Sequence, residues 1–216
     1  MGRWRTGVLA FLLMMGITAC EVDDYDSGDN RYSYMRADFG MLHTTTDTKA
    51  DYVLTDDGDS IFFSKSSPVK WATTADTLYR ALVYYDVASK QFFSAKPVGV
   101  VTPVLKPQTG TISTDPLTIE SLWVSGGFLN IGFAVKTGQT DSVDVQQQIG
   151  LMLEGVAIDV RGKNVFTLRV MHAQNNIPEY YTVRAYMSMP LTDDMQGAAI
   201  RLRVNTYEGE KIFLML

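Results

Sequence analysis

The sequence has one cysteine, Cys20, and two histidines, His43 and His172, among its 216 residues. One cysteine cannot form an internal disulfide or a cysteine-based zinc site, and two histidines leave few ligands for a histidine metal centre. Clusters of Lys and Arg are missing too, and the net charge is −5. The few possible ligands lead us to expect no metal and no cofactor. Because nucleic-acid binding needs a basic surface, we also expect no nucleic-acid partner.

Motifs for catalysis are equally scarce. The sequence has no Gly-x-Ser-x-Gly elbow, no His-Glu-x-x-His and no phosphate-binding loop. A Ser-His-Asp triad through His43 or His172 stays open, because triads are defined by geometry and not by sequence order. A lone histidine at a strand end is more commonly a surface or packing residue. We therefore expect no enzyme and keep a hydrolase as the less favoured alternative.

The first 20 residues are typical of an export signal. Arg3 and Arg5 give a positive start, and an uncharged apolar stretch of 13 residues follows from Gly7 to Ala19. Spanning a bilayer takes about 20 residues, so this stretch is too short for a membrane helix. The ending Ile17-Thr18-Ala19-Cys20 resembles a bacterial lipobox, in which the cysteine receives a diacylglycerol and becomes the new N-terminus after cleavage.

We therefore predict that Cys20 is the lipidation site and that acyl chains on it anchor the protein in the outer membrane. The other interpretations are a free buried cysteine and an ordinary secretory signal. The ten residues after Cys20 contain five acids and no base: Glu21, Asp23, Asp24, Asp26 and Asp29. This composition predicts a flexible acidic tether. It also resembles the export signals of surface lipoproteins, so the periplasmic face and the cell-surface face both stay open.

From about Ala37 onward, apolar residues alternate with other residues, which is the period-two pattern of half-buried strands. The predicted apolar faces are Tyr79, Ala81, Val83, Tyr85 and Val87; Leu129, Ile131, Phe133 and Val135; Phe166, Leu168 and Val170; Tyr181, Val183, Ala185, Met187 and Met189; Ala198, Ile200, Leu202 and Val204; and a final strand with Ile212, Leu214 and Leu216. Turn signals such as Asp57-Gly58 and Asn175-Asn176 separate the runs. Short strands at this spacing predict an all-β sandwich or barrel.

Two further segments bear on the fold. Val145, Ile149, Met152 and Val156 have helical spacing, but the all-β context favours a strand from Ile149 to Leu153. Prolines cluster between Pro103 and Pro116. Because proline is poorly placed inside a central strand, we expect a domain boundary there.

Aromatic residues offer candidate ligand-binding positions. Trp71 lies in a polar loop, Tyr84 lies on the mixed face of its strand, and Tyr180 follows a turn. Such residues can stack on sugar rings or line a protein interface. Core packing is the commoner role of an aromatic residue in a strand, and we expect it for Trp123.

An acidic cluster, Asp56, Asp57 and Asp59, raises the possibility of calcium. Calcium needs six to eight oxygens, usually with a closing bidentate carboxylate, and no Glu follows at a suitable distance. A hairpin turn at Asp57-Gly58 explains the cluster better.

Several motifs, taken in order, resemble the NigD-like lipoproteins of Bacteroidota. Besides the lipobox, they are the Tyr52–Phe63 hairpin, Thr77–Tyr85, Leu122–Ile131 and Tyr186–Leu191. The resemblance implies an all-β chain with a small N-terminal OB-like barrel and an antiparallel, immunoglobulin-like β-sandwich. Together with the proline-rich boundary, it predicts a signal peptide at 1–19, a tether at 20–36, the barrel at 37–108 and the sandwich at 109–216.

The resemblance implies no catalytic residues, and the family takes its name from a bacteriocin-associated locus. The leading expectation is a lipid-anchored binding or accessory module with a protein or glycan partner. The alternative is a bacteriocin-associated lipoprotein that acts in immunity or secretion.

Overall fold

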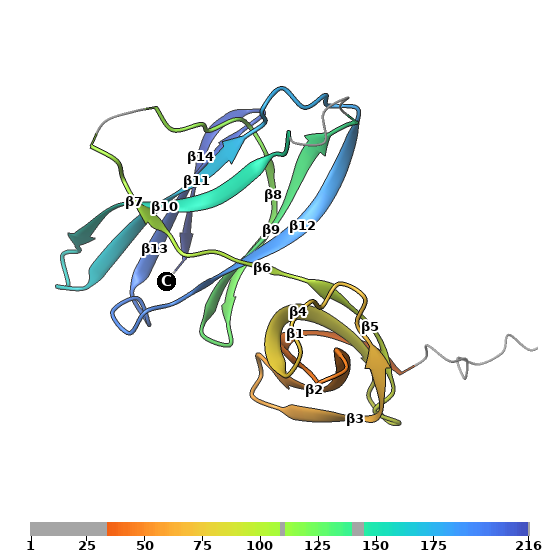
Figure 1. Ribbon diagram of the computed structural model, residues 1–216. Coiled ribbons are helices and arrows are strands. Elements are labelled where there is room, and N and C mark those ends of the chain that lie inside the picture. The colour runs from red at the N-terminus through yellow and green to blue at the C-terminus, as the bar shows by residue number, and fades with distance from the viewer. Residues whose placement is uncertain (1–33, 109–110, 140–144, 216) are drawn as a thin grey trace, which may run out of the picture. The chain divides into compact units, whose positions relative to one another are not determined.

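The computed structural model describes residues 34–108, 111–139 and 145–215 (Figure 1). Every element in these ranges is a β-strand, so the predicted all-β fold is confirmed. None of the described segments forms a helix long and apolar enough to cross a membrane. Cys20, the predicted signal peptide and most of the predicted tether lie outside the described residues.

The first five strands form one curled sheet, here called the barrel, with the order β3-β2-β1-β4-β5. Its strands are β1 (Met35–Thr44), β2 (Lys49–Thr55), β3 (Ser60–Pro68), β4 (Thr77–Asp86) and β5 (Phe92–Pro97). The amide of Ser64 in β3 donates to the carbonyl of Lys90, just before β5, at 3.0 Å. This contact brings the two outer strands together, as expected for a five-stranded OB-like barrel.

The remaining strands form two sheets, here called the sandwich, with the orders β14-β13-β11-β10-β7 and β6-β12-β9-β8. They are β6 (Gly99–Val100), β7 (Val104–Leu105), β8 (Thr118–Ser125), β9 (Phe128–Thr137), β10 (Gln148–Ile158), β11 (Asn164–Ala173), β12 (Tyr181–Pro190), β13 (Ala199–Thr206) and β14 (Gly209–Met215). Most pairs are antiparallel. β11 and β13 are parallel, because the chain crosses to the other sheet as β12 before it returns.

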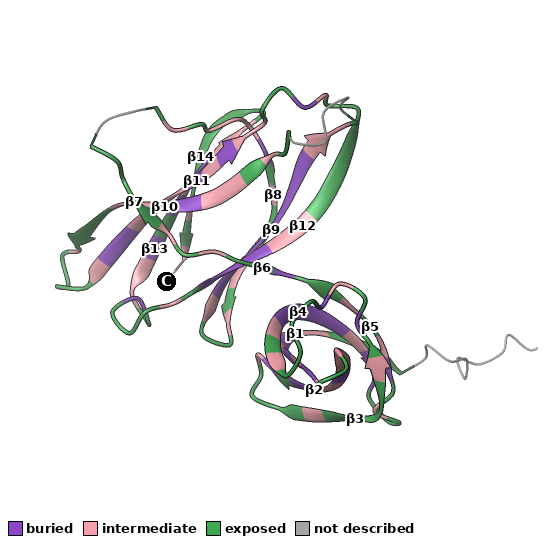
Figure 2. Cartoon of the chain, viewed as in Figure 1, coloured by how far each residue is buried: buried purple, intermediate pink, exposed green. Residues whose placement is uncertain are grey.

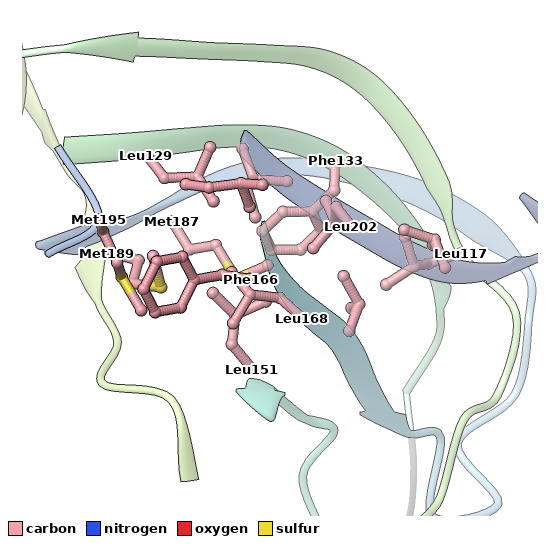
Figure 3. Packing of buried hydrophobic residues seen from close by; sticks show 14 of the residues in the cluster. Leu117, Leu129, Phe133, Leu151, Phe166, Leu168, Met187, Met189, Met195 and Leu202 are labelled. Atoms are coloured by element: carbon pink, nitrogen blue, oxygen red, sulfur yellow. The ribbon is translucent and has the colours of Figure 1, made fainter. Parts of the chain in front are cut away.

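The apolar faces predicted by alternation supply the two cores. Figure 3 shows the sandwich core, where Leu129, Phe133, Phe166, Leu168 and Leu202 pack together with Met187, Met189 and Met195. The barrel core contains Leu42, Val53, Ala81, Val83 and Tyr85. Each core is supplied by one side of each strand, as the period-two pattern requires.

Three faces differ from the simple alternation. The final strand forms as predicted, but Ile212 and Leu214 are exposed, and Phe213 and Met215 pack against the core instead. β12 is buried only at its C-terminal end, and Figure 2 shows its change from exposed to buried. In β4 the face opposite the core is buried at Leu82, Asp86 and the charged Arg80, whereas Leu78 on the same face is exposed.

Two local choices are settled by the strand assignments. The segment with helical spacing is a strand, β10, as the all-β context predicted. The hairpin at Asp57-Gly58 joins β2 and β3, with Gly58 at a φ of 92° and its amide bonded to the carbonyl of Thr55 at 3.0 Å. A positive φ at this turn position is what favours glycine.

β6 and β7 lie before the boundary predicted at residues 108 and 109, yet both pair with strands that follow it. β6 runs parallel to β12, and β7 runs parallel to β10. At the other end, β1 begins at Met35, two residues before the predicted start of the barrel. The division of the chain into domains therefore stays a prediction.

Four charged side chains form a closed ring on the outer side of the five-stranded sandwich sheet. Arg169 contacts Glu154 at 2.6 Å and Glu210 at 2.7 Å, and Arg203 contacts the same two carboxylates at 3.1 and 2.6 Å. The ring joins β10, β11, β13 and β14. Burial raises the pKa of Glu154, but its hydrogen bonds and ion pairs with the two arginines outweigh burial and hold that pKa below its ordinary value.

Within the barrel, β1 approaches β2 closely at Gly40. A Cβ atom added at Gly40 would collide with the carbonyl oxygen of Leu54 and would lie 2.8 Å from a methyl group of Val53. Gly155, in β10, has open space around its Cα instead. Both glycines lie in strands, so Gly155 can serve as the uncrowded control for a substitution at Gly40.

We expect Gly40→Ala to lower the free energy of unfolding by about 1–3 kcal/mol, because the backbone of β2 must move to admit the methyl group. Gly155→Ala should leave that free energy unchanged within about 0.5 kcal/mol. Urea denaturation followed by circular dichroism measures both. Equal stability of the two variants would contradict the close approach.

Candidate functional site

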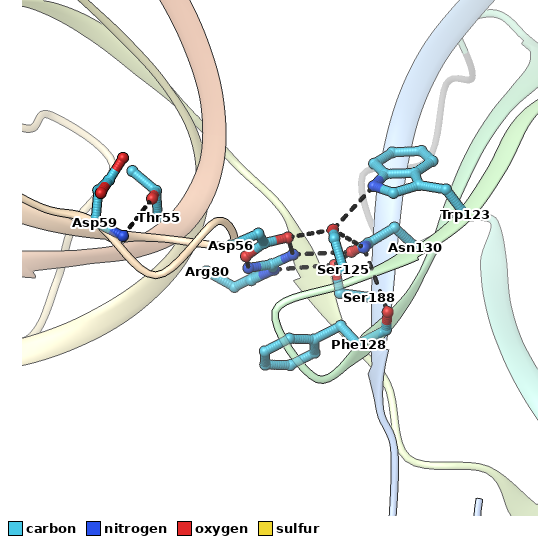
Figure 4. Close-up of polar contacts among 9 residues, drawn as sticks. All are labelled: Thr55, Asp56, Asp59, Arg80, Trp123, Ser125, Phe128, Asn130 and Ser188. Atoms are coloured by element: carbon cyan, nitrogen blue, oxygen red, sulfur yellow. Dashed lines mark hydrogen bonds and ion pairs between the residues drawn. The ribbon is translucent and has the colours of Figure 1, made fainter. Parts of the chain in front are cut away.

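One buried arginine connects the barrel to the sandwich. The Arg80 side chain, on β4, has 0% exposure and contacts Asp56 through both terminal nitrogens, with Nη2 at 2.7 Å from Oδ2. Its Nε donates to Ser188 at 3.2 Å, and Nη2 also donates to Asn130 at 2.9 Å. Figure 4 shows these contacts together with Ser125. We call these five residues the joint.

The joint is closed by hydrogen bonds among its own polar groups. Ser125 donates to Asp56 at 2.5 Å and accepts from the amide of Asn130 at 3.0 Å. Ser188 donates to Asn130 at 2.6 Å, and the indole of Trp123 donates to Ser125 at 3.0 Å. The Arg80 guanidinium also lies 4.3 Å from the ring centroid of Phe128, so one face of the cation packs on an aromatic ring.

The charges of the joint compensate each other. Burial raises the pKa of Asp56, but the hydrogen bonds from Arg80 and Ser125 and the charge of Arg80 outweigh burial, so the pKa is lower than its ordinary value. Asp56 is therefore a carboxylate at neutral pH, bound to a permanent cation. Such a satisfied pair holds elements together and has no group free for proton transfer.

A second polar region lies at one end of the sandwich, at the residues 111–116, 145–148 and 173–180 of three connecting segments. We call this region the loop end. Three adjoining hollows of 360, 420 and 420 Å³ share lining residues there. Most of the polar lining is uncharged: Thr111, Ser113, Gln146, Gln147, Gln148, Gln174, Asn175 and Asn176.

The turn at Asn175 and Asn176 gives the loop end its shape. Both residues have left-handed φ values, 52° and 60°, and the amide of Ile177 donates to the carbonyl of Gln174 at 3.1 Å. Two consecutive positive φ values define a type I′ turn, which asparagine tolerates. Asn175 also donates to the carbonyl of Gln146 at 2.7 Å, and this bond ties the turn to the neighbouring segment.

Tyr180 is the most exposed of the predicted aromatic candidates, at 80%, and follows Glu179 at the rim of the loop end. Its amide donates to the carbonyl of Thr137 at 2.9 Å. A Cβ atom added at Gly138 would lie 2.9 Å from the Tyr180 ring. The absence of a side chain at Gly138 thus lets the ring lie close to the backbone.

The other two aromatic candidates lie in the barrel, away from Tyr180 in the chain and in the sheets. The indole of Trp71 donates to the carbonyl of Ala95 at 2.8 Å and packs edge-on against Tyr79 at 5.3 Å, so its contacts are those of a packing residue. Tyr84 is half-buried on β4, between Ala37 and Ser94 of the neighbouring strands. The three candidates therefore do not form one site.

Both histidines lie in described strands. The Nδ1 of His43 lies 2.7 Å from Asp51, its Nε2 lies 3.4 Å from Asp76, and its ring stacks on Tyr52 at 4.6 Å. Both ring nitrogens thus face carboxylates. In a Ser-His-Asp triad, one nitrogen would instead bind the nucleophile.

His172 is 1% exposed, and its Nδ1 lies 3.1 Å from the carbonyl oxygen of Asp115. A carbonyl oxygen can only accept, so Nδ1 is the donor in this contact. Within the described part of the chain, Nε2 is buried without a hydrogen-bond partner. The histidine therefore packs beneath the loop end, and no hydroxyl or thiol of the described residues is bonded to it.

The acidic cluster divides between separate contacts. Asp56 belongs to the joint, Asp57 pairs with Arg36 at 3.0 Å, and Asp59 lies in the β2–β3 turn, where its carbonyl accepts from the amide of Thr55. Across the described ranges, no group of three or more His, Cys, Asp or Glu residues is placed to hold a metal ion.

Sequence reasoning missed the joint. In the sequence, Arg80 is the one charged residue within the apolar run Leu78–Tyr85. Such a residue can be buried with a partner or exposed on the mixed face of its strand, and the sequence does not distinguish the two. Trp123, expected in a core, is half-buried beside the joint and packs edge-on against Phe39 at 4.9 Å.

We expect Arg80→Met to lower the free energy of unfolding by about 3–5 kcal/mol, because the variant leaves the Asp56 carboxylate buried without its partner. Arg184→Met is the control. Arg184 is 72% exposed and pairs with Glu120, so its loss should cost less than about 1 kcal/mol. Urea denaturation measures both variants, and equal losses would contradict the role of the joint.

Comparisons with known proteins agree with this architecture. A family model described as the NigD-like C-terminal beta sandwich domain matches residues 100–215. No curated protein matches the chain.

Several solved structures are similar to the chain. One is a NigD-like immunity protein from Bacteroides caccae, with 20% identity and a TM-score of 0.63, covering 83% of this chain and 91% of that one. Another is a candidate toxin-related protein from Parabacteroides distasonis, with 18% identity, a TM-score of 0.61 and coverage of 84% and 92%. A candidate lipoprotein from Bacteroides fragilis has 11% identity, a TM-score of 0.52 and coverage of 83% and 96%.

At these identities, the similar structures support the fold alone. The family model covers more than half of the chain and includes both sheets of the sandwich. The chain belongs to the NigD-like family of Bacteroidota.

Proposed function

We propose that the protein is a lipid-anchored, non-catalytic binding lipoprotein of the outer membrane, and that it holds a glycan chain at the loop end of its sandwich. The observation that carries the proposal is the amide-rich, mostly uncharged polar lining of the three hollows, together with the exposed Tyr180, which directly follows the lining residue Glu179. Concave surfaces with a few polar groups and an aromatic ring are the usual form of a small-ligand site.

The chemistry of the loop end suits hydroxyl groups. Amide side chains both donate and accept hydrogen bonds, as sugar hydroxyls do. The two acids of the region are already engaged: Asp115 accepts from the backbone N–H of Gln174 at 2.7 Å, and Glu179 pairs with Lys136 at 3.4 Å. Glu179 is thus paired with a cation and Asp115 is held by a backbone N–H, and the remaining polar side chains of the lining are suited to a neutral ligand. The Tyr180 ring adds an apolar face of the kind that interfaces favour.

The second candidate is a role in bacteriocin immunity or secretion. It is favoured by the description of the similar Bacteroides caccae protein as an immunity protein. In that case the loop end would bind a secreted polypeptide, and the same surface residues would carry the interaction.

We expect Tyr180→Ala to weaken glycan binding about tenfold, which corresponds to about 1.4 kcal/mol, a typical contribution of an aromatic contact. The measurement is binding of the detergent-solubilised full-length protein to an array of neutral oligosaccharides, followed by titration of the best ligand.

Tyr34→Ala is the matched control, because Tyr34 is also an exposed tyrosine but lies at the start of the barrel. It should bind as the wild type does. Binding of a secreted bacteriocin and of no glycan would support the second candidate. Equal affinity of the Tyr180 variant and the wild type would place the ligand elsewhere.

The anchor is the other part of the proposal. Its support is the lipobox that ends at Cys20 and the candidate lipoprotein among the similar structures. Two or three acyl chains on one residue give stable anchoring.

We expect Cys20→Ser to abolish labelling by radioactive palmitate and to shift the protein from the membrane fraction to the soluble fraction of the envelope. Protease added to intact cells then separates the two faces of the membrane. Digestion indicates the cell surface, and protection until lysis indicates the periplasm. Continued palmitate labelling of the serine variant would rule out Cys20 as the site.

A further inference from the structure

An open cleft of 280 Å³ lies beside the joint, and neither the glycan nor the anchor uses it. Its aromatic and charged lining comes from three segments: Asp38 and Phe39 in β1, Asp56 and Asp57 in the β2–β3 turn, and Trp123 in β8. Figure 4 shows Asp56 and Trp123 meeting at Ser125, which also lines the cleft.

The aromatic wall of the cleft is held in a fixed arrangement. Phe39 packs edge-to-face with Trp123 at 4.9 Å and 75°, and with Tyr186 at 5.1 Å and 84°. The indole N–H of Trp123 is already bonded to Ser125 at 3.0 Å. The part of the indole that stays exposed is therefore apolar, and an indole ring is the aromatic group that attracts cations best.

All three charged residues that line the cleft are acids. Arg80 compensates Asp56, which leaves Asp38 and Asp57. These two share one cation, Arg36, whose guanidinium lies 2.8 Å from Asp38 and 3.0 Å from Asp57. Counted together, the rim keeps one uncompensated negative charge.

Of the two rim acids, Asp57 is the one open to a ligand. Asp38 also accepts the hydroxyl of Tyr85 at 2.6 Å, and burial followed by this hydrogen bond raises the pKa of Tyr85 to about 12, so the hydroxyl keeps its proton. Asp57 is 69% exposed, and its contact with Arg36 is an exposed ion pair. Exposed pairs contribute about 0–1 kcal/mol, so an incoming cation can replace this one at little cost.

We propose that this cleft binds a basic side chain of a partner protein, with the cationic group between Asp57 and the indole of Trp123. The carboxylate supplies charge, and the ring supplies an apolar and electron-rich wall. A phosphate-bearing ligand is disfavoured, because the charges at the rim have the same sign as phosphate. This second site is independent of the glycan site of the proposed function.

The test uses Trp123 as its own reporter. N-acetylarginine amide is titrated into the full-length protein in detergent, and tryptophan emission is recorded. The expected result is a saturable change in emission that is missing in Trp123→Phe. N-acetylglutamine amide, a neutral ligand, should give no saturable change. Raising the salt concentration from about 0.05 to 0.5 M should weaken arginine binding, because the interaction is between exposed charges.

The deciding variant is Asp57→Asn, which should weaken arginine binding about fivefold or more. Since Asp57 is exposed, this variant should unfold in urea at the wild-type midpoint. Asp47→Asn is the matched control, because Asp47 is equally exposed and pairs with one cation, Lys49, outside the cleft. It should bind arginine as the wild type does.

The proposal is overturned if arginine and glutamine amides give equal signals, or if Asp57→Asn binds as Asp47→Asn does. Tyr180→Ala should leave arginine binding unchanged, and Asp57→Asn should leave glycan binding unchanged. The two proposed sites are therefore tested separately, and loss of binding at one site leaves the measurement at the other site unaffected.

Discussion

The ion pair between Arg80 and Asp56 is the interaction on which the rest of the arrangement depends. Each charge is costly to bury alone, and the pair is tolerated only because additional hydrogen bonds satisfy the remaining polar atoms. Those bonds come from β8, β9 and β12, while the pair itself belongs to the barrel. The requirement to satisfy one buried cation thus specifies which strand ends of the sandwich meet the barrel. Buried apolar contacts alone would be less selective, because hydrophobic packing is not directional.

The same constraint explains why polar residues occur in strands that are otherwise apolar. Asn130 and Ser188 are 0% exposed and interrupt runs that supply the sandwich core. They lie on the opposite side of their strands from Leu129, Ile131 and Met187, and so they face the joint. The neighbouring cleft follows from this geometry. Because the polar groups of the joint are satisfied by each other, the surface beside them offers an aromatic wall and an exposed carboxylate, Asp57, whose partner is the exposed Arg36.

Much of the fold was predictable from local patterns, since side-chain alternation and turn residues are local properties. The β2–β3 hairpin and most core faces follow from them, whereas the strand β10 was predicted from the all-β context against a helical local spacing. The joint was not predictable, because its partners are far apart in the sequence: Arg80 and Ser188 are separated by 108 residues. The loop end was visible only in part. Tyr180 was identified, but the amides around it come from three segments that only the folded sheets bring together.

The short strands β6 and β7 have a consequence for the edges of the two sandwich sheets. A sheet ends in a strand with unpaired backbone groups, and such an edge can recruit another molecule and begin aggregation. β6 lies at the end of one sheet, against β12, and β7 lies at the end of the other, against β10. The segment that leads out of the barrel therefore covers one edge of each sandwich sheet, while β14 and β8 form the opposite edges. A sandwich produced from residue 109 onward would lose both of these covering strands, which agrees with a family model that begins at residue 100.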